Sequence, residues 1–247
     1  MRGCQLSVDP DGKYLFVAGY HDGKATVMNL NPDGTVGSIA AGVYHKGLGS
    51  VAERMFRPHV SCVRMTPDKK FVMVADLGVD QVKIYKFNDE TGKITLVDML
   101  RCELESAPRI IKFSPDGRFA YLICELKNYI SVYTYKDGPR GPVFELVQTI
   151  STLNEYHSKG SAACVLRFSR YWNYVLCSNA GDNSVGIFKI DRETGMLEKI
   201  CILPISGDYP KAIDFFPDNQ HIMSLNHESN TITTFEVHYD KKYFAAK

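Results

Sequence analysis

The amino-acid sequence predicts an all-β fold, a β-propeller built from four-stranded antiparallel blades. One pattern of strands and turns recurs five times along the 247 residues. No apolar period of 3.6 residues persists for the roughly 10 to 12 residues that a helix needs. Repeats of about 50 residues with four short strands each are typical of propeller blades, whereas solenoid repeats are shorter.

Each repeat has the same order of predicted elements. An apolar strand leads through a turn, usually Pro-Asp, to a second strand rich in Val, Phe and Tyr, and a polar turn precedes a third, alternating strand. Proline presets φ at the first central turn position, and Asp and Gly tolerate the bend that follows. Thr-Gly turns at residues 91–92 and 194–195 predict fourth strands at 94–100 and 196–203. The repeated segments are 4–30, 61–87, 109–135, 164–190 and 212–237, with turn positions Pro10, Pro67, Pro115, Arg170 and Pro217.

These repeats predict a single propeller domain over residues 1–247. The expected blade repeats are 1–55, 56–105, 106–155, 156–207 and 208–247. The chain opens on the innermost strand of one blade and stops soon after the third strand of another. Unprotected blade edges are usually covered in native proteins, so we expect N-terminal sequence and a short C-terminal piece to be missing.

Composition narrows the function classes. Apolar residues make up 45% and charged residues 23%, as in soluble globular proteins. The net charge of +1 gives no basic field, so neither a nucleic acid nor a membrane is an expected partner. No apolar run approaches the roughly 20 residues of a transmembrane helix, and the N-terminus lacks a signal-peptide pattern. Seven widely spaced cysteines without a CxxC motif predict free thiols and a cytoplasmic location.

Propeller topology predicts where a site lies. The first strand of each blade lines the channel and the second runs antiparallel to it, so strand-one starts and strand-two ends meet at one mouth. A ring of cationic and acidic side chains there suits an anionic small molecule. The strand-one starts give His59, Arg109, Cys164 and Lys211, and the strand-two ends give Tyr20, His21, Asp76, Glu125, Asn179, Asn226 and His227.

Structural roles compete with function at several of these positions. Asx side chains such as Asp76, Asn179 and Asn226 commonly cap turns at strand ends. Their oxygens, with those of Glu125, are also an alternative cage for a hard cation such as Ca²⁺.

Four other side chains have structural alternatives as well. His21 and His227 precede polar turns, which favours solvated side chains, and Cys164 fits a packed thiol. Arg109 is also suited to bridging two blades. By contrast, Glu125 stands between Cys124 and Leu126 in an otherwise apolar strand, where a carboxylate needs a partner, and this favours a functional role.

Several stretches resemble the seven-bladed propeller lactonase family, which includes propeller-type bacterial 6-phosphogluconolactonase and fungal muconate-lactonising enzymes. The matching stretches are 57–61 (RPHVS), 75–82 (ADLGVDQV), 107–109 (APR), 125–126 (EL) and 178–184 (SNAGDNS). The resemblance covers essentially the whole chain. It implies a seven-bladed fold, of which this chain, with its five repeats, would be a truncated form.

The resemblance implies lactone hydrolysis without a metal or cofactor. The expected reaction converts 6-phosphogluconolactone to 6-phosphogluconate, in the pentose phosphate pathway of glucose metabolism, and the expected partner is that small-molecule substrate. The family pattern places His59, Arg109 and Glu125 at the active-site mouth as catalytic residues. Lys211, Asp76, Asn179, His21 and Asn226 are the expected substrate-binding residues.

The chain also departs from the family pattern. Charged or imidazole side chains of the family are replaced at Ser61, Ile110, Cys164 and Ala180, and a later Pro-Arg pair has become Pro210-Lys211. These replacements lower the number of charged side chains in the ring at the channel mouth. They keep open the alternative of a non-catalytic propeller that binds a small anionic ligand or a protein.

Overall fold

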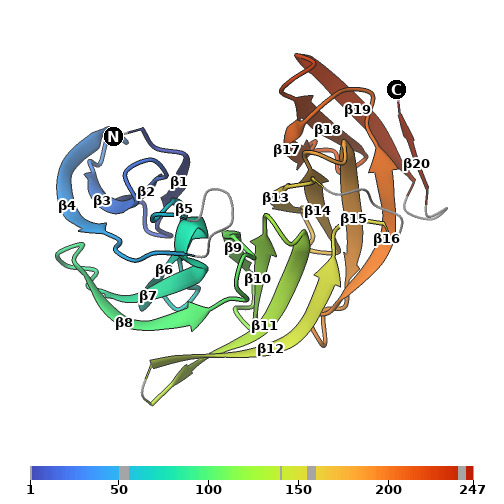
Figure 1. Cartoon of the computed structure of the whole chain (residues 1–247). Helices are drawn as coiled ribbons and strands as arrows, with labels where there is room; N and C mark the ends of the chain where they lie inside the picture. Colours follow the sequence, from blue (N-terminus) through green and yellow to red (C-terminus); the bar gives the residue numbers. More distant parts are fainter. Residues whose placement is uncertain (1, 50–55, 140, 155–159, 239–242, 247) are drawn as a thin grey trace. The chain divides into compact units, whose positions relative to one another are not determined.

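The computed structural model describes residues 2–49, 56–139, 141–154, 160–238 and 243–246. In these residues the chain forms five antiparallel sheets, each made of four consecutive strands (Figure 1). This confirms the prediction of an all-β propeller fold with about five blade repeats. The one helical segment in the described part is the 3₁₀ helix η1 (Leu77–Val79), and no helix there is long and apolar enough to span a membrane.

The twenty strands found in the described residues follow one another in chain order. The first sheet holds β1 (Gln5–Val8), β2 (Tyr14–Gly19), β3 (Lys24–Leu30) and β4 (Val36–Tyr44), and the second β5 (Val60–Met65), β6 (Phe71–Asp76), β7 (Gln81–Phe87) and β8 (Ile94–Arg101). The third holds β9 (Pro108–Phe113), β10 (Phe119–Cys124), β11 (Tyr129–Gly138) and β12 (Gly141–Ser151). The fourth holds β13 (Ala163–Phe168), β14 (Tyr174–Asn179), β15 (Ser184–Ile190) and β16 (Leu197–Pro204), and the fifth β17 (Pro210–Phe215), β18 (His221–Asn226), β19 (Thr231–His238) and β20 (Tyr243–Ala246).

The chain divides into two compact units. Unit 1 comprises Met1–Leu122 with Tyr135–Glu145, and unit 2 comprises Ile123–Thr134 with Leu146–Lys247, so the boundary runs through the third sheet. The predicted blade boundaries near residues 55 and 155 lie outside the described residues. The organisation of all five repeats as one domain stays a prediction.

The core of unit 1 lies between its first two sheets. Tyr14 and Phe16 of β2 pack against Phe87 of β7, with ring centroids 5.3 and 5.7 Å apart in edge-to-face geometry. Edge-to-face aromatic pairs add about 0.5–1.5 kcal/mol to the stabilisation from buried area. The other buried members of this core are Ala18, Ala25, Val27, Val60, Val63, Met65, Val72, Val74 and Tyr85.

Unit 2 has a corresponding core between the fourth and fifth sheets. Apolar side chains of β14 and β15 pack there against those of β17, β18 and β19, and the residues are Leu176, Val185, Ile187, Ile213, Ile222, Phe235 and Val237. Cys164 and Ala180 belong to the same cluster. All seven cysteines of the chain are free thiols, as the sequence predicted.

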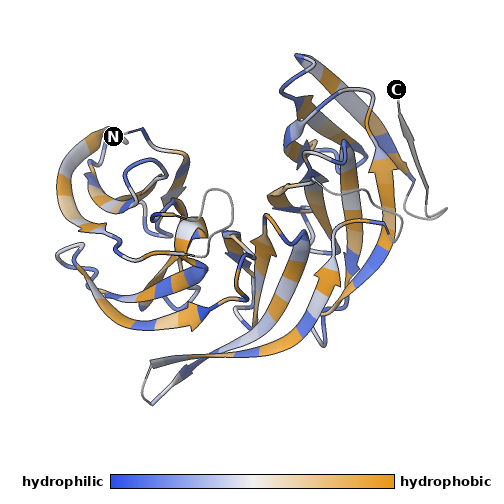
Figure 2. Cartoon of the chain, in the orientation of Figure 1, coloured by the Kyte–Doolittle hydropathy of each residue, from blue (hydrophilic) through white to orange (hydrophobic). Residues whose placement is uncertain are grey.

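Burial differs between the second and the fourth strand of a blade. Every residue of β6 and β10 is buried, whereas β4 and β8 are mostly exposed or half-buried. Figure 2 shows apolar residues along the strands and hydrophilic residues in many of the connecting turns. β6 and β10 therefore lie in dense packing, and their ends are rigid places to hold a side chain.

The first turn of a blade is closed by a short polar side chain at the end of its first strand. Asp9, Thr66, Ser114 and Ser169 each accept the backbone N–H five residues further on, at 2.6–3.0 Å. Such side-chain bonds replace a backbone partner inside the turn. The predicted strand-turn-strand pattern thus has a shared hydrogen-bonding basis in four of the five repeats.

The turn after the second strand uses a left-handed residue. Its φ lies between 52° and 57° in all five repeats, at Gly23, Asp80, Asn128, Asn183 and Asn230. Gly, Asn and Asp are the residues that adopt this conformation at low cost. The turn therefore positions the strand-two end in the same way in every blade.

Two glycines allow a close backbone approach beside this turn. A Cβ on Gly78 would overlap the carbonyl oxygen of Arg57, and one on Gly181 would overlap that of Gly160. Both glycines lie two residues after a strand-two end, Asp76 and Asn179 respectively.

We expect Gly78→Ala to destabilise the protein by about 3 kcal/mol or more, because the clash is with backbone that cannot rotate away. Urea unfolding measures the change. Gly42→Ala is the matched control, since a Cβ there first meets the far end of the flexible Lys24 side chain. Equal stability of the two variants would contradict the predicted backbone approach.

Candidate functional site

The inner strands carry β-bulges where the sequence predicted a channel mouth. The register shifts at Val60/Cys62, Ala163/Val165 and Pro210/Ala212 leave Ser61, Cys164 and Lys211 as the extra residues. A bulge turns its side chain away from the regular alternation, and bulges are frequent beside active sites. Arg109 follows Pro108 at the start of β9, as Lys211 follows Pro210 at the start of β17.

His59 is buried at this end of unit 1. The residue directly precedes β5 and is 4% exposed. Its ring stacks on the Tyr20 ring, with the two centroids 4.3 Å apart. Its Nδ1 lies 3.1 Å from the Tyr20 carbonyl oxygen, and the ring edge of Phe56 packs at 6.0 Å. A carbonyl oxygen only accepts, so Nδ1 carries the proton and the neutral ring keeps a lone pair on Nε2.

Burial holds the pKa of His59 below its ordinary value of 6.5. The bond to Tyr20 and the negative charge of Asp76 act in the opposite direction, and the Arg57 charge assists the lowering. The neutral imidazole is therefore the stable form at neutral pH, as a proton acceptor requires.

Asp76 connects three segments of unit 1. It ends β6, is fully buried, and caps η1 by accepting the Gly78 N–H at 3.1 Å on Oδ1. The same oxygen accepts the backbone N–H of His59 at 2.7 Å. Its other oxygen, Oδ2, lies 2.6 Å from Nδ1 of His45. The capping role weighed for this residue is thus present, and one of the bonds holds His59.

Arg109 lies at the same end of the inner strands. The Ser61 hydroxyl donates to the Arg109 carbonyl oxygen at 2.8 Å and fixes the start of β9 against β5. The Arg109 side chain is half-buried. Burial raises the pKa of the Cys4 thiol, whereas a bond from the Tyr20 backbone and the Arg109 charge lower it. Cys4 Sγ lies 3.5 Å from the Val60 carbonyl oxygen at the start of β5.

The remaining predicted residue of unit 1 is His21. It is exposed, and its ring meets the Tyr20 ring edge-on with centroids 5.3 Å apart. Unit 1 therefore brings together four of the predicted residues around Tyr20 and the start of β5, and these are His21, His59, Asp76 and Arg109.

In unit 2, Glu125 directly follows β10 and is 1% exposed. Its carbonyl oxygen accepts the Ala163 N–H at 3.0 Å, which ties it to the start of β13. Asn179 is fully buried, and its Nδ2 donates to the Thr152 carbonyl oxygen at 2.8 Å and to the Ser184 hydroxyl at 3.0 Å.

Lys211 and Asn226 lie at the corresponding positions of the fifth sheet. Lys211 is exposed. Asn226 is buried and donates to Thr233 at 2.9 Å and Thr231 at 3.1 Å, while its Oδ1 accepts the Ser224 hydroxyl at 2.7 Å. Unit 2 thus holds the other four predicted residues, Glu125, Asn179, Lys211 and Asn226, and their roles stay predictions.

Some oxygens of the cation cage weighed from the sequence are already engaged in hydrogen bonds. Both oxygens of Asp76 face N–H donors, and Oδ1 of Asn226 is occupied by a hydroxyl. Across the described residues, no three His, Cys, Asp or Glu side chains are grouped so as to hold a metal ion.

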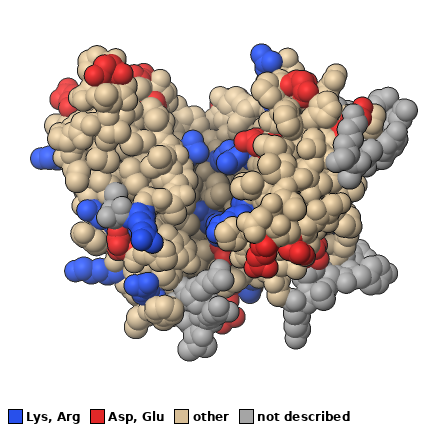
Figure 3. All heavy atoms as spheres, turned by 90° about the horizontal axis from the view of Figure 1, so that it is seen from above, with Lys and Arg blue, Asp and Glu red and all other residues tan. Residues whose placement is uncertain are grey.

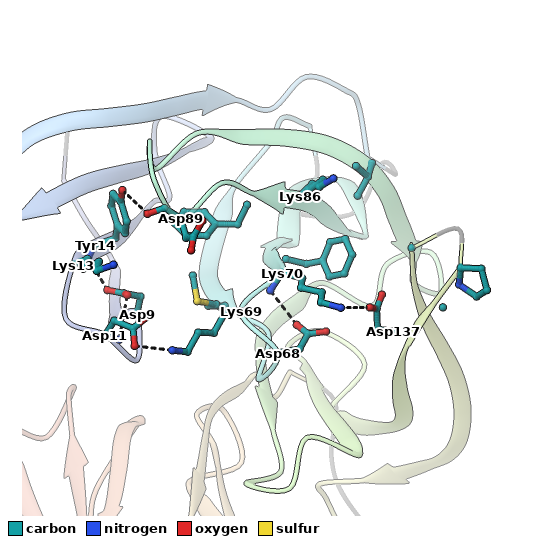
Figure 4. A pocket seen from close by; sticks show the side chains of 17 residues that line it. Asp9, Asp11, Lys13, Tyr14, Asp68, Lys69, Lys70, Lys86, Asp89 and Asp137 are labelled. Carbon is teal, nitrogen blue, oxygen red and sulfur yellow. Dashed lines mark hydrogen bonds and ion pairs between the residues drawn. The ribbon is translucent and has the colours of Figure 1, made fainter.

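A pocket of about 740 Å³ opens in unit 1 at the other end of the inner strands, beside the first turns (Figure 4). Its charges largely neutralise one another. Lys69 pairs with Asp11 at 2.6 Å, and Lys70 pairs with Asp137 at 2.5 Å. Histidine is not among its lining residues, so we place the candidate chemistry at the His59 end.

Surface charge does not single out one ligand class. Figure 3 shows both acidic and basic side chains on the face that it draws. This agrees with the net charge of +1.

Sequence reasoning did not identify His45, Tyr85 or the hydroxyl of Ser61. His45 and Tyr85 are 31 and 9 residues from Asp76 and lie outside the strand ends considered. Ser61 was noted only as a departure from the family pattern, although its hydroxyl positions Arg109. His45 could have been singled out only because it is a titratable residue directly after a fourth strand.

Comparison with known proteins identifies the family. A sequence profile described as "Lactonase, 7-bladed beta-propeller" matches residues 1–243. The chain belongs to the seven-bladed β-propeller lactonase family.

Relatives of this lactonase-family protein include 6-phosphogluconolactonase of Bacillus subtilis, 27% identical over 233 residues, covering 94% of this chain and 65% of the relative. A Bacteroides fragilis structure, provisionally assigned as a 6-phosphogluconolactonase, is 27% identical with a TM-score of 0.86, covering 99% of this chain and 68% of that one. The periplasmic gluconolactonase of Pseudomonas aeruginosa is 25% identical with a TM-score of 0.88, covering 97% and 67%. The chain thus spans about two thirds of the length of these relatives.

We expect His59 to titrate below pH 6.5 in the folded protein, because burial disfavours its charged form. The unfolded chain then takes up this proton at higher pH than the folded one. The stability contributed by neutral His59 is therefore complete above pH 6.5 and is lost as the pH falls below it. NMR titration of ¹⁵N-histidine-labelled protein, assigned with His59→Gln, measures the midpoint, and a value above 6.5 would contradict the burial argument.

Proposed function

We propose that this protein hydrolyses a sugar lactone, 6-phosphogluconolactone, to 6-phosphogluconate, as a carboxylic-ester hydrolase of carbohydrate metabolism. Membership of the lactonase family supports the reaction class, and the name of the B. subtilis relative supports the substrate. The structural observation that carries the proposal is a buried, neutral His59 whose Nδ1 is committed to Tyr20, at the end of unit 1 that also holds Arg109.

In the proposed reaction, water attacks the lactone carbonyl carbon while a base removes one of its protons. The tetrahedral oxyanion then collapses, the bond to the ring oxygen breaks, and that oxygen takes up the proton. Water is thereby added across the ester bond. His59 supplies Nε2 as this base, a role that contributes about 10²–10⁴ in rate.

Arg109 supplies positive charge in the same proposal. Its guanidinium holds the developing oxyanion, or the phosphate of the substrate, by charge-assisted hydrogen bonds. The Ser61 bond to its carbonyl oxygen supports this role, because it fixes the backbone from which the side chain extends.

Glu125 is the alternative base. Its carboxylate is buried to 1% exposure beside the start of β13, where a structural side chain would more commonly be apolar. The equivalent positions next to the left-handed turn hold Leu77 and Ala180 in the neighbouring blades.

A second candidate function is a non-catalytic propeller that binds a small anion or a protein. Cys164 and Ala180 favour it. Both side chains are packed into the apolar core of unit 2, where they add no charge to the mouth.

Hydrolysis of 6-phosphogluconolactone, followed by pH-stat against its spontaneous rate, tests the proposal, with the B. subtilis relative as positive control. Unphosphorylated gluconolactone, the type of substrate in the name of the P. aeruginosa protein, serves as a second substrate. Turnover of the phosphorylated lactone supports the proposal. Folded protein that binds 6-phosphogluconate but turns over neither lactone supports the binding function instead.

If Glu125 rather than His59 is the base, Glu125→Gln lowers kcat by about 10²-fold or more with little change in KM, because the amide cannot accept a proton but keeps the shape of the side chain. Steady-state hydrolysis measures both constants. Glu198→Gln, an exposed position on β16, is the matched control. Unchanged turnover in Glu125→Gln would remove this residue from the mechanism and leave His59 as the base.

We expect Arg109→Lys to lower kcat/KM by about tenfold or more, because an ammonium cannot give the two parallel bonds of a guanidinium. A loss confined to KM of the phosphorylated lactone would assign Arg109 to the phosphate, and a loss in kcat for both lactones would assign it to the oxyanion. Arg118→Lys, on an exposed side chain paired with Asp116, is the control. Wild-type kinetics in Arg109→Lys would contradict both roles.

A further inference from the structure

A buried chain of hydrogen bonds runs behind His59 in unit 1. His45 follows β4, and its Nδ1 lies 2.6 Å from Oδ2 of Asp76, with both side chains fully buried. On the other side of the ring, Nε2 of His45 lies 3.1 Å from the hydroxyl of Tyr85 on β7. The His45 and Tyr85 rings are nearly parallel, with centroids 6.1 Å apart. Three strands of two neighbouring blades thus meet at one imidazole.

The proton positions in this chain follow from the partners. Burial, with a smaller effect of the Asp76 charge, raises the pKa of Tyr85 to about 12, so its hydroxyl stays protonated. That hydroxyl donates to Nε2 of neutral His45, or accepts from it when the ring is protonated. In both cases Nδ1 bears a hydrogen and donates it to Asp76.

Asp76 passes this constraint to His59. Its Oδ2 accepts a hydrogen bond from His45, while its Oδ1 accepts hydrogen bonds from the backbone N–H groups of His59 and Gly78. The two oxygens belong to one rigid plane, so the direction of the His45 bond sets the position of the acceptor for the His59 peptide. Displacements of about 1 Å at a reacting group cost on the order of 10² in rate.

The same junction elsewhere in the chain is built without a histidine and a carboxylate. In each blade concerned, the residue after the fourth strand donates its backbone N–H to the carbonyl oxygen of the left-handed residue. His45 donates in this way to Gly23, and Thr152 donates to Asn128. Thr152 is therefore the counterpart of His45, and Asn179 is the counterpart of Asp76. There, a neutral amide donates to a carbonyl oxygen at 2.8 Å. Since the fold closes this junction with an amide, the Asp76–His45 pair is not a general requirement of a blade.

We propose that His45 is a positioning residue of the candidate active site, which acts through Asp76 to hold the backbone of His59. This inference rests on the proposed lactonase function for its kinetic consequences. Its structural content, the coupling of His45 to His59, can be measured independently of any activity.

The test compares His45→Ala, which removes the donor, with His45→Asn, whose side-chain N–H group can replace Nδ1 at the same distance from the backbone. Tyr135→Phe is the matched control. It removes a tyrosine hydroxyl bonded to a carboxylate at 2.7 Å at the opposite end of the inner strands. For each protein, kcat and KM for 6-phosphogluconolactone, the hydrogen exchange rate of the His59 amide and the unfolding temperature are measured.

We expect His45→Ala to lower kcat by about tenfold to hundredfold with KM nearly unchanged, and to speed exchange of the His59 amide. His45→Asn restores both to within about threefold of the wild type, and Tyr135→Phe changes neither. A purely structural role would lower the unfolding temperature and leave the kcat of the folded protein intact, which would overturn the proposal.

If His45→Ala does not fold, His45→Asn and Tyr85→Phe are compared instead. His45→Asn keeps a donor to Asp76, whereas Tyr85→Phe removes the hydroxyl that holds the His45 ring in place. Faster His59 exchange in Tyr85→Phe than in His45→Asn supports the proposal, and equal rates contradict it. If the wild type hydrolyses no lactone, the proposed function fails. The positioning inference then stands or falls on whether replacement of His45 changes His59 amide exchange.

Discussion

The buried carboxylate of Asp76 is the constraint on which the candidate site depends. A carboxylate without solvent is costly unless donors surround it, and a hydrogen bond to a charged group contributes about 1.5–3 kcal/mol. The donors come from His59 before β5, from Gly78 in η1 and from His45 after β4. Satisfying this one side chain therefore fixes three loops relative to β6. The position of the His59 backbone is a consequence of that arrangement, whereas burial and the Tyr20 carbonyl oxygen keep its imidazole neutral.

Much of the fold could be predicted from the sequence because its determinants are local. The turns after the first strands repeat a Pro-Asp pattern, and the structure closes four of them with a side chain five residues before the bonded N–H. The left-handed position before the third strand holds Gly, Asp or Asn in every repeat. Turn residues of this kind can be recognised in the sequence because their bonds span only a few residues. Their recurrence about every 50 residues is enough to indicate blades.

The site was less predictable because its geometry depends on pairing between distant segments. The bulges that set Ser61, Cys164 and Lys211 apart are properties of strand register, which alternation of residue types does not reveal. The bond of His45 to Asp76 spans 31 residues. Topology correctly placed His59 beside Asp76, since a strand-one start must adjoin a strand-two end. Which hydrogen bonds they form follows only from the folded backbone.

The repeated junction also explains how a propeller can acquire chemistry without losing its fold. One backbone frame, with a strand-two end, a left-handed turn and the exit of a fourth strand, accommodates Asp76 with His45 and Asn179 with Thr152. At the equivalent strand-two end of the fifth sheet, Asn226 bonds three hydroxyl side chains instead. The backbone bonds that close the frame are common to these blades, so the side chains are free to differ. The ionisable pair Asp76–His45 therefore changes only one junction and not the fold. Because Asp76 also bonds the His59 backbone, this pair is the one with a proposed functional role.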